Sequence, residues 1–158
     1  MATSQIRILL VDDFRPFRLY VSSMLQKRSD VCIVGEAEDG IEAVERASEL
    51  SPDLIFLDVG LPKLNGVNAA RQMRTASPES KIIFLSQETS IEIIEEALAT
   101  GAKGYIVKSA LSTELMSAIN IVIRGGYFVG TGCGALRTDI SKQKEDSGGQ
   151  QHDEVLHF

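Results

Sequence analysis

Acidic residues stand directly after two apolar stretches of the sequence. Asp12 and Asp13 follow the run at 6–11, and Asp58 follows the run at 54–57. Apolar runs of this length, bounded by polar or turn residues, predict strands buried on both faces. In an open parallel sheet such residues meet at the carboxyl edge, where ligands bind. A lone aspartate there could equally cap the next helix, so the combination of Asp58 with the acidic pair is what indicates chemistry.

Two further polar side chains end predicted strands at the same edge. Ser86 follows the run at 81–85, and Lys108 follows the run at 104–107. Three carboxylates brought together repel one another, and burial makes the repulsion worse. Mg²⁺ relieves it, because this ion prefers oxygen ligands and binds through one or two carboxylates and several waters. The set suits phosphoryl transfer onto Asp58 as the nucleophile, with Lys108 and Ser86 holding the phosphoryl oxygens.

The positions of these residues follow from a regular alternation of strands and helices. We predict strands at 6–11, 31–37, 54–57, 81–85 and 104–107, and helices at 14–26, 41–50, 66–75, 90–100 and 111–124. Strands that alternate with helices across short loops predict an α/β fold, with a parallel sheet covered on both faces. The expected fold is flavodoxin-like, a doubly wound (βα)5 parallel sheet with strand order 2-1-3-4-5.

Bulk properties narrow the class of protein. The 158 residues are 44% hydrophobic and 24% charged, which is typical of one soluble globular domain. A net charge of -6 disfavours nucleic-acid binding by bulk electrostatics, because that binding depends on Lys and Arg. Cys32 and Cys133 lack the spacing of a metal site. Without a signal-peptide pattern or an apolar run of membrane length, we expect a cytoplasmic protein with no membrane partner.

Over residues 5–126 the chain resembles the receiver domain of two-component response regulators. The resemblance implies that Asp58 accepts a phosphoryl group from a partner histidine kinase. It implies that Asp13 and Asp58 bind Mg²⁺ directly, that Asp12 does so through water, and that the backbone carbonyl of Gly60 is a further ligand. The matching residues are Val11-Asp12-Asp13, Asp58 with Leu61-Pro62 and Gly66, Ser86, and Gly104-Tyr105-Ile106-Val107-Lys108.

The same resemblance implies a switch pair, Ser86 and Tyr105. Ser86 would move toward the phosphoryl group, and Tyr105 would rotate inward to fill the space. Judged from the residues alone, Tyr105 also fits a half-buried strand aromatic. The face expected to change includes three residues of the fourth helix. Glu88, two residues after Ser86, is predicted to orient an attacking water and to give an intermediate phosphoryl lifetime. The helix residues are Ile93, Glu96 and Ala97.

Finer features are similar to the NarL/LuxR-type subfamily, whose members normally carry a helix-turn-helix domain after the receiver. These features are the stretch at 35–40, the Lys108-Ser109 pair and the stretch at 125–128. By analogy, a homodimer through the first and fifth helices is expected. After Gly126 only 32 residues remain, too few for such an output domain. Residues 127–158 are therefore expected to be a linker or tail, or the start of a truncated output domain, and DNA is a partner only if that domain exists.

A glycine-rich segment at 130–134 lies within this region. It resembles a phosphate-cradling loop, but it follows a helix and lacks the Lys-Ser/Thr of a nucleotide-binding loop. We therefore expect a turn or linker there.

The preferred interpretation is a phosphorylation-dependent switch that controls an output such as transcription, with no enzymatic activity beyond self-phosphorylation and autodephosphorylation. One alternative is a pseudo-receiver, an interaction or dimerisation module that works without phosphorylation. Another is a Mg²⁺-dependent phosphatase on a related α/β fold. Such a phosphatase normally has a second acid two residues after its nucleophile, where this chain has Gly60.

Overall fold

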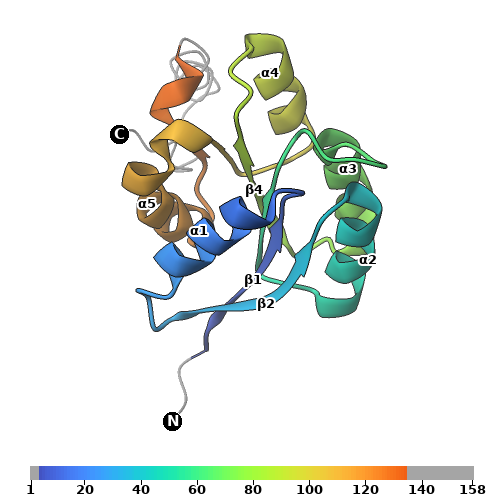
Figure 1. The fold of residues 1–158 in the computed structure, drawn as a ribbon. Helices are drawn as coiled ribbons and strands as arrows, with labels where there is room; N and C mark the ends of the chain where they lie inside the picture. The colour runs from blue at the N-terminus through green and yellow to red at the C-terminus, as the bar shows by residue number, and fades with distance from the viewer. Residues whose placement is uncertain (1–3, 135–158) are drawn as a thin grey trace, which may run out of the picture.

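The computed structural model describes residues 4–134, which fold into one parallel sheet flanked by helices (Figure 1). The strand order is β2-β1-β3-β4-β5-β6. This confirms the predicted doubly wound fold and adds a sixth strand. The strands are β1 Ile6–Val11, β2 Val31–Ala37, β3 Leu54–Leu57, β4 Lys81–Ser86, β5 Gly104–Val107 and β6 Phe128–Val129. The helices are α1 Arg15–Leu25, α2 Gly40–Leu50, α3 Gly66–Ala76, α4 Ile91–Ala99 and α5 Leu111–Ile123, with short 3-10 turns η1 Lys108–Ala110 and η2 Thr131–Cys133.

Two apolar cores lie on opposite faces of the sheet. Figure 1 shows α1 and α5 on one side and α2 and α3 on the other. Successive strand residues point to opposite faces. In β3, for example, Ile55 and Leu57 join the core of α2, α3 and α4, whereas Leu54 and Phe56 join the core of α1 and α5. All four are fully buried, which is why the strand has no polar residue until Asp58.

Local caps set where several helices begin. The side chains of Asp39, Asn65 and Ser90 each accept a hydrogen bond from a backbone N–H in the first turn of α2, α3 and α4. Such N-caps satisfy donors that the helix itself leaves free. In α1 there is no side-chain cap, and Pro16 in the first turn fixes the backbone instead. In the part of the chain that the structure describes, no helix is long and apolar enough to span a membrane.

The sixth strand corrects the expectation that residues after 126 form a linker. The N–H of Phe128 donates to the Lys103 carbonyl and the N–H of Gly130 to the Tyr105 carbonyl, each at 2.9 Å. Phe128 and Val129 are buried. Burial of these apolar side chains stabilises β6, which covers an edge that β5 would otherwise present unpaired. The rest of the expected tail, including Glu154-Val155-Leu156, lies outside the described residues.

The glycine-rich segment packs tightly against the domain. A Cβ on Gly130 would lie 2.3 Å from the Oε1 of Glu114, and one on Gly132 would lie 2.5 Å from the Cγ2 of Val107. Between them, Thr131 donates from its N–H and its hydroxyl to the Oε2 of Glu114. The glycines thus allow close approach to α5 and β5.

We expect Gly132→Ala to lower the free energy of unfolding by about 1–3 kcal/mol, because the new methyl group overpacks against Val107. Urea denaturation measures this. Gly60→Ala is the matched control, since a Cβ there meets nothing within 4 Å. Equal stabilities of the two variants would contradict the close packing of η2.

Candidate functional site

Three carboxylates converge at the carboxyl edge of the sheet. Asp12 follows β1 and Asp58 follows β3, and these strands are neighbours. The N–H of Asp58 donates to the Val11 carbonyl at 3.2 Å, which sets the two acids side by side. Asp12, Asp13 and Asp58 each offer an oxygen within 4.8 Å of the others. Asp12 and Asp58 are buried and Asp13 is exposed, so one side of the cluster opens to solvent. The predicted convergence of these acids is confirmed.

Lys108 reaches this cluster from the end of β5, two strands away from β3 at the same edge of the sheet. Its Nζ donates to the Oδ2 of Asp12 at 2.7 Å and to the Oδ2 of Asp58 at 3.3 Å. Only 14% of its side chain is exposed, so solvent screens these ion pairs poorly. One ammonium still faces three carboxylates. The site therefore keeps a negative balance that suits a hard divalent cation.

Asp12 is the most deeply buried of the three carboxylates. Loss of solvation raises the pKa of Asp12 above its usual value, and the nearby charge of Asp58 acts in the same direction. Hydrogen bonds from Lys108 and from the N–H of Phe14, which lies 2.8 Å from the Oδ1, lower the pKa but do not cancel the effect of burial. A buried acid that is costly to ionise becomes easier to ionise when a second cation joins Lys108.

Ser86 and Tyr105 lie next to each other on β4 and β5. Ser86 is buried at the end of β4, and its Oγ accepts a hydrogen bond from the N–H of Glu88 at 3.2 Å. Tyr105 is fully buried rather than half-buried. Its hydroxyl donates to the carbonyl of Glu88 at 2.8 Å, and burial raises the pKa of Tyr105 to about 12. The side chain therefore already points inward in this structure, whereas its rotation stays a prediction.

Most of the predicted site residues line one small cavity. Its volume is about 330 Å³, and Glu88 also contributes to its wall. The donors are carboxylate oxygens, a hydroxyl, and a backbone segment at Gly60, which is the oxygen-only set that Mg²⁺ prefers. Tyr105 does not line the cavity, but its hydroxyl donates to the carbonyl of Glu88, which does. The predicted site residues that line the cavity are Asp12, Asp13, Asp58, Gly60, Ser86 and Lys108.

Sequence reasoning missed a buried arginine that supports the site. Arg18 is buried in α1, and its Nη1 donates to the backbone carbonyl of Asp12 at 2.6 Å. Its other nitrogens pair with Glu36 at 2.7 Å and Glu38 at 3.3 Å. The signal was present, since Arg18 precedes Val21 by three positions on the buried stripe of an amphipathic helix. A charged residue on such a stripe indicates a paired, structural role.

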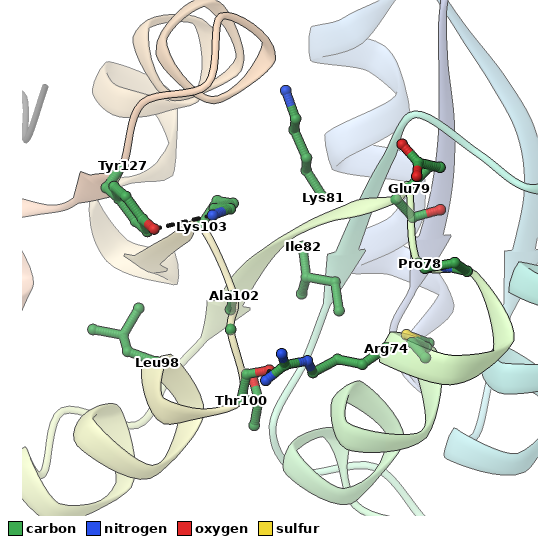
Figure 2. Close-up of a pocket in the computed structure, with 13 residues that line it drawn as sticks. Arg74, Pro78, Glu79, Lys81, Ile82, Leu98, Thr100, Ala102, Lys103 and Tyr127 are labelled. Atoms are coloured by element: carbon green, nitrogen blue, oxygen red, sulfur yellow. Dashed lines mark hydrogen bonds between the residues drawn. The ribbon is translucent and has the colours of Figure 1, made fainter. Parts of the chain in front are cut away.

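A larger cavity of about 640 Å³ lies at the opposite end of the sheet, between the ends of α3 and α4 and the start of β4 (Figure 2). Two basic side chains in its wall already form hydrogen bonds within the protein. Arg74 donates to the Thr100 carbonyl at 3.1 Å, and Lys103 donates to the Tyr127 hydroxyl at 3.0 Å. Because none of the predicted site residues lines this cavity, volume alone does not identify the functional site.

The doubly wound sheet with three carboxylates at its carboxyl edge defines a class of α/β domains whose candidate site lies where the parallel strands end. Residues 8–120 match the response regulator receiver domain. The chain belongs to this family, as the sequence predicted, and its relatives are response regulators of the NarL/LuxR type.

Named relatives agree with this assignment. The chain is 33% identical over 126 residues to the transcriptional regulatory protein DegU of Brevibacillus brevis, an alignment that covers 80% of this chain and 53% of that protein. A LuxR-family two-component response regulator from Aurantimonas is similar in structure, with a TM-score of 0.78, 27% identity, and coverage of 90% and 99%. The receiver domain of the putative regulator NarL from Mycobacterium tuberculosis matches with a TM-score of 0.74, 29% identity, and coverage of 78% and 99%. The chain spans about half the length of the first curated relatives it matches.

We expect Arg18→Met to lower the free energy of unfolding by about 2 kcal/mol, because the Asp12 carbonyl and Glu36 lose their partner. Arg15→Met is the matched control, since Arg15 is exposed on the same helix. Urea denaturation of both variants measures the difference. If Arg15→Met were as costly as Arg18→Met, the contacts of Arg18 would not support the site.

Proposed function

We propose that this chain is a phosphorylation-dependent receiver in which Asp58 accepts a phosphoryl group from a histidine kinase. The observation that carries the proposal is the ammonium of Lys108, held between Asp12 and Asp58 inside one cavity. Family membership supports it, because receiver domains are signalling modules of two-component systems. The acids and the ammonium expected for phosphoryl transfer are all present.

The reaction is a displacement at phosphorus. A carboxylate oxygen of Asp58 attacks the phosphorus of a phosphohistidine, the new O–P bond forms, and the P–N bond breaks with its electron pair left on the imidazole nitrogen. The product is an acyl phosphate, which adds about one to two negative charges at neutral pH. Lys108 and Ser86 bind the phosphoryl oxygens. Beyond this step and the hydrolysis of the acyl phosphate, in which water attacks phosphorus and returns the Asp58 carboxylate and inorganic phosphate, the proposal includes no catalytic turnover.

The donor set fits Mg²⁺. Asp13 and Asp58 would hold the ion directly, Asp12 through water, and Gly60 through its backbone carbonyl. When bound, the ion supplies positive charge that favours the approach of a phosphoryl group to an acidic site. The exposed position of Asp13 gives the ion a path from solvent.

The switch would run from Ser86 to α4. If Ser86 moves toward the phosphoryl group, it leaves the N–H of Glu88, whose carbonyl accepts the hydrogen bond from Tyr105. The loop before α4 is thus linked to both members of the switch pair. This supports a change in the face that includes Ile93 and Glu96, whereas Ala97 is fully buried in the core and does not belong to that face.

The proposed output is transcription, by analogy with the regulators that the chain resembles. A homodimer through α1 and α5 belongs to the same proposal, by analogy with this type of regulator. A cytoplasmic location belongs to it as well, since the kinase must reach Asp58. Because the chain spans about half of its first relatives, DNA binding is proposed only for a helix-turn-helix domain joined to it.

We expect titration with beryllofluoride, a phosphoryl mimic, in the presence of Mg²⁺ to shift the amide NMR signals of Ser86, Tyr105 and α4. Asp58→Asn should abolish the shifts, because it removes the carboxylate oxygen that bonds beryllium. Glu79→Gln, exposed at the far end of the sheet, is the control and should behave as the parent. A parent protein without any shift would favour the phosphorylation-independent interaction module.

A second expectation concerns the lifetime of the acyl phosphate. Glu88 contributes to the wall of the cavity and can orient an attacking water, whereas Gly60 has no side chain to do so. We expect Glu88→Ala to dephosphorylate more slowly than the parent, measured by loss of the phosphorylated species over time. Equal rates would remove Glu88 from the mechanism.

A further inference from the structure

We propose that Phe17 is a positioning residue that holds the ammonium of Lys108 ready to bind a phosphoryl group. The inference rests on the proposed function and extends it to a side chain that contributes no ligand atom. The Nζ of Lys108 lies 4.1 Å from the centroid of the Phe17 ring. A cation within about 6 Å of a ring face is attracted by the ring quadrupole.

The ring covers a side of the ammonium that the carboxylates leave free. Two hydrogen bonds of Lys108 go to Asp12 and Asp58. The lysine side chain is only 14% exposed, so the ammonium is largely withdrawn from water. Cation–π attraction is strongest for such desolvated cations. Phe17 therefore contributes where the charge is least hydrated.

The first turn of α1 fixes the ring in place. Pro16 restricts the backbone at the start of the helix, and the N–H of Phe17 donates to the Phe14 carbonyl at 3.0 Å. The next residue, Arg18, is buried and bonded to the Asp12 carbonyl. Phe17 also packs against the core shared by α1 and α5. The same turn that carries the ring is thus anchored to the strand end that carries Asp12.

A ring has an advantage over another carboxylate in this position. Two of the three N–H donors of the ammonium already point at carboxylates, so the ammonium has to turn to direct a donor at a phosphoryl oxygen on Asp58. A ring face attracts the cation without a directed hydrogen bond, so the ammonium can turn from Asp12 to the new oxygen while it stays over Phe17. The aromatic side chain keeps the cation at the site through the change of partner.

The test compares two ligands in three variants. We expect Phe17→Leu to weaken beryllofluoride binding about fivefold at saturating Mg²⁺, measured by ¹⁹F NMR. Mg²⁺ affinity, measured by calorimetry without beryllofluoride, should stay equal or rise, because the ammonium competes with the ion for Asp12 and Asp58. Phe17→Tyr keeps an aromatic face and should bind as the parent. Leu19→Ala, which removes an exposed apolar side chain from the same helix, should also bind as the parent.

A graded series separates charge attraction from packing. Phenylalanine with one, two or three ring fluorines at position 17 keeps nearly the same shape while the ring face loses negative potential. Beryllofluoride affinity should fall stepwise along the series. A flat series, or a parallel loss of Mg²⁺ and beryllofluoride affinity in Phe17→Leu, would overturn the role of Phe17. Failure of the parent protein to bind beryllofluoride would overturn the proposed function itself.

Discussion

Crowding of negative charge at the end of β1 and β3 is the constraint on which the structure depends. Asp12 and Asp58 are buried side by side, and Asp13 adds a third carboxylate at the solvent edge. Repulsion among these groups would oppose folding without opposite charge close by. The chain supplies that charge from Lys108 at the end of β5, and it braces the backbone of Asp12 with Arg18 from α1. Arg18 and Lys108 both act at this edge of the sheet, so the positions of α1 and η1 are tied to the position of Asp12.

The same edge of the sheet carries the contacts through which the proposed phosphorylation would act on α4. Ser86 and Tyr105 are bonded to the same residue, Glu88, through its N–H and its carbonyl. A loop that depends on two side chains from two strands has few ways to move without disturbing the helix that follows it. Under the proposed function, charge added on Asp58 would therefore act on the loop before α4 through Ser86 and Glu88.

Much of this arrangement could be predicted from the sequence. The apolar runs that end in Asp12, Asp58, Ser86 and Lys108 indicated the strands, their parallel order and the convergence of the site. The sequence did not reveal β6, because Phe128–Val129 is too short to show strand periodicity and gains its structure only by pairing with β5. Arg18 and Phe17 were missed for a related reason. A helical pattern shows which face is buried, but it does not show that a buried arginine meets a backbone carbonyl or that a ring lies over an ammonium.

The two-residue strand β6 makes the two borders of the sheet unlike each other. One border is the seven-residue β2, and the other is this short strand, followed at once by the tight turn η2. A border so short offers little template for a foreign backbone to join the sheet. A protein that recognises this side of the domain therefore meets side chains of α4, α5 and η2, and its selectivity comes from their shape and charge.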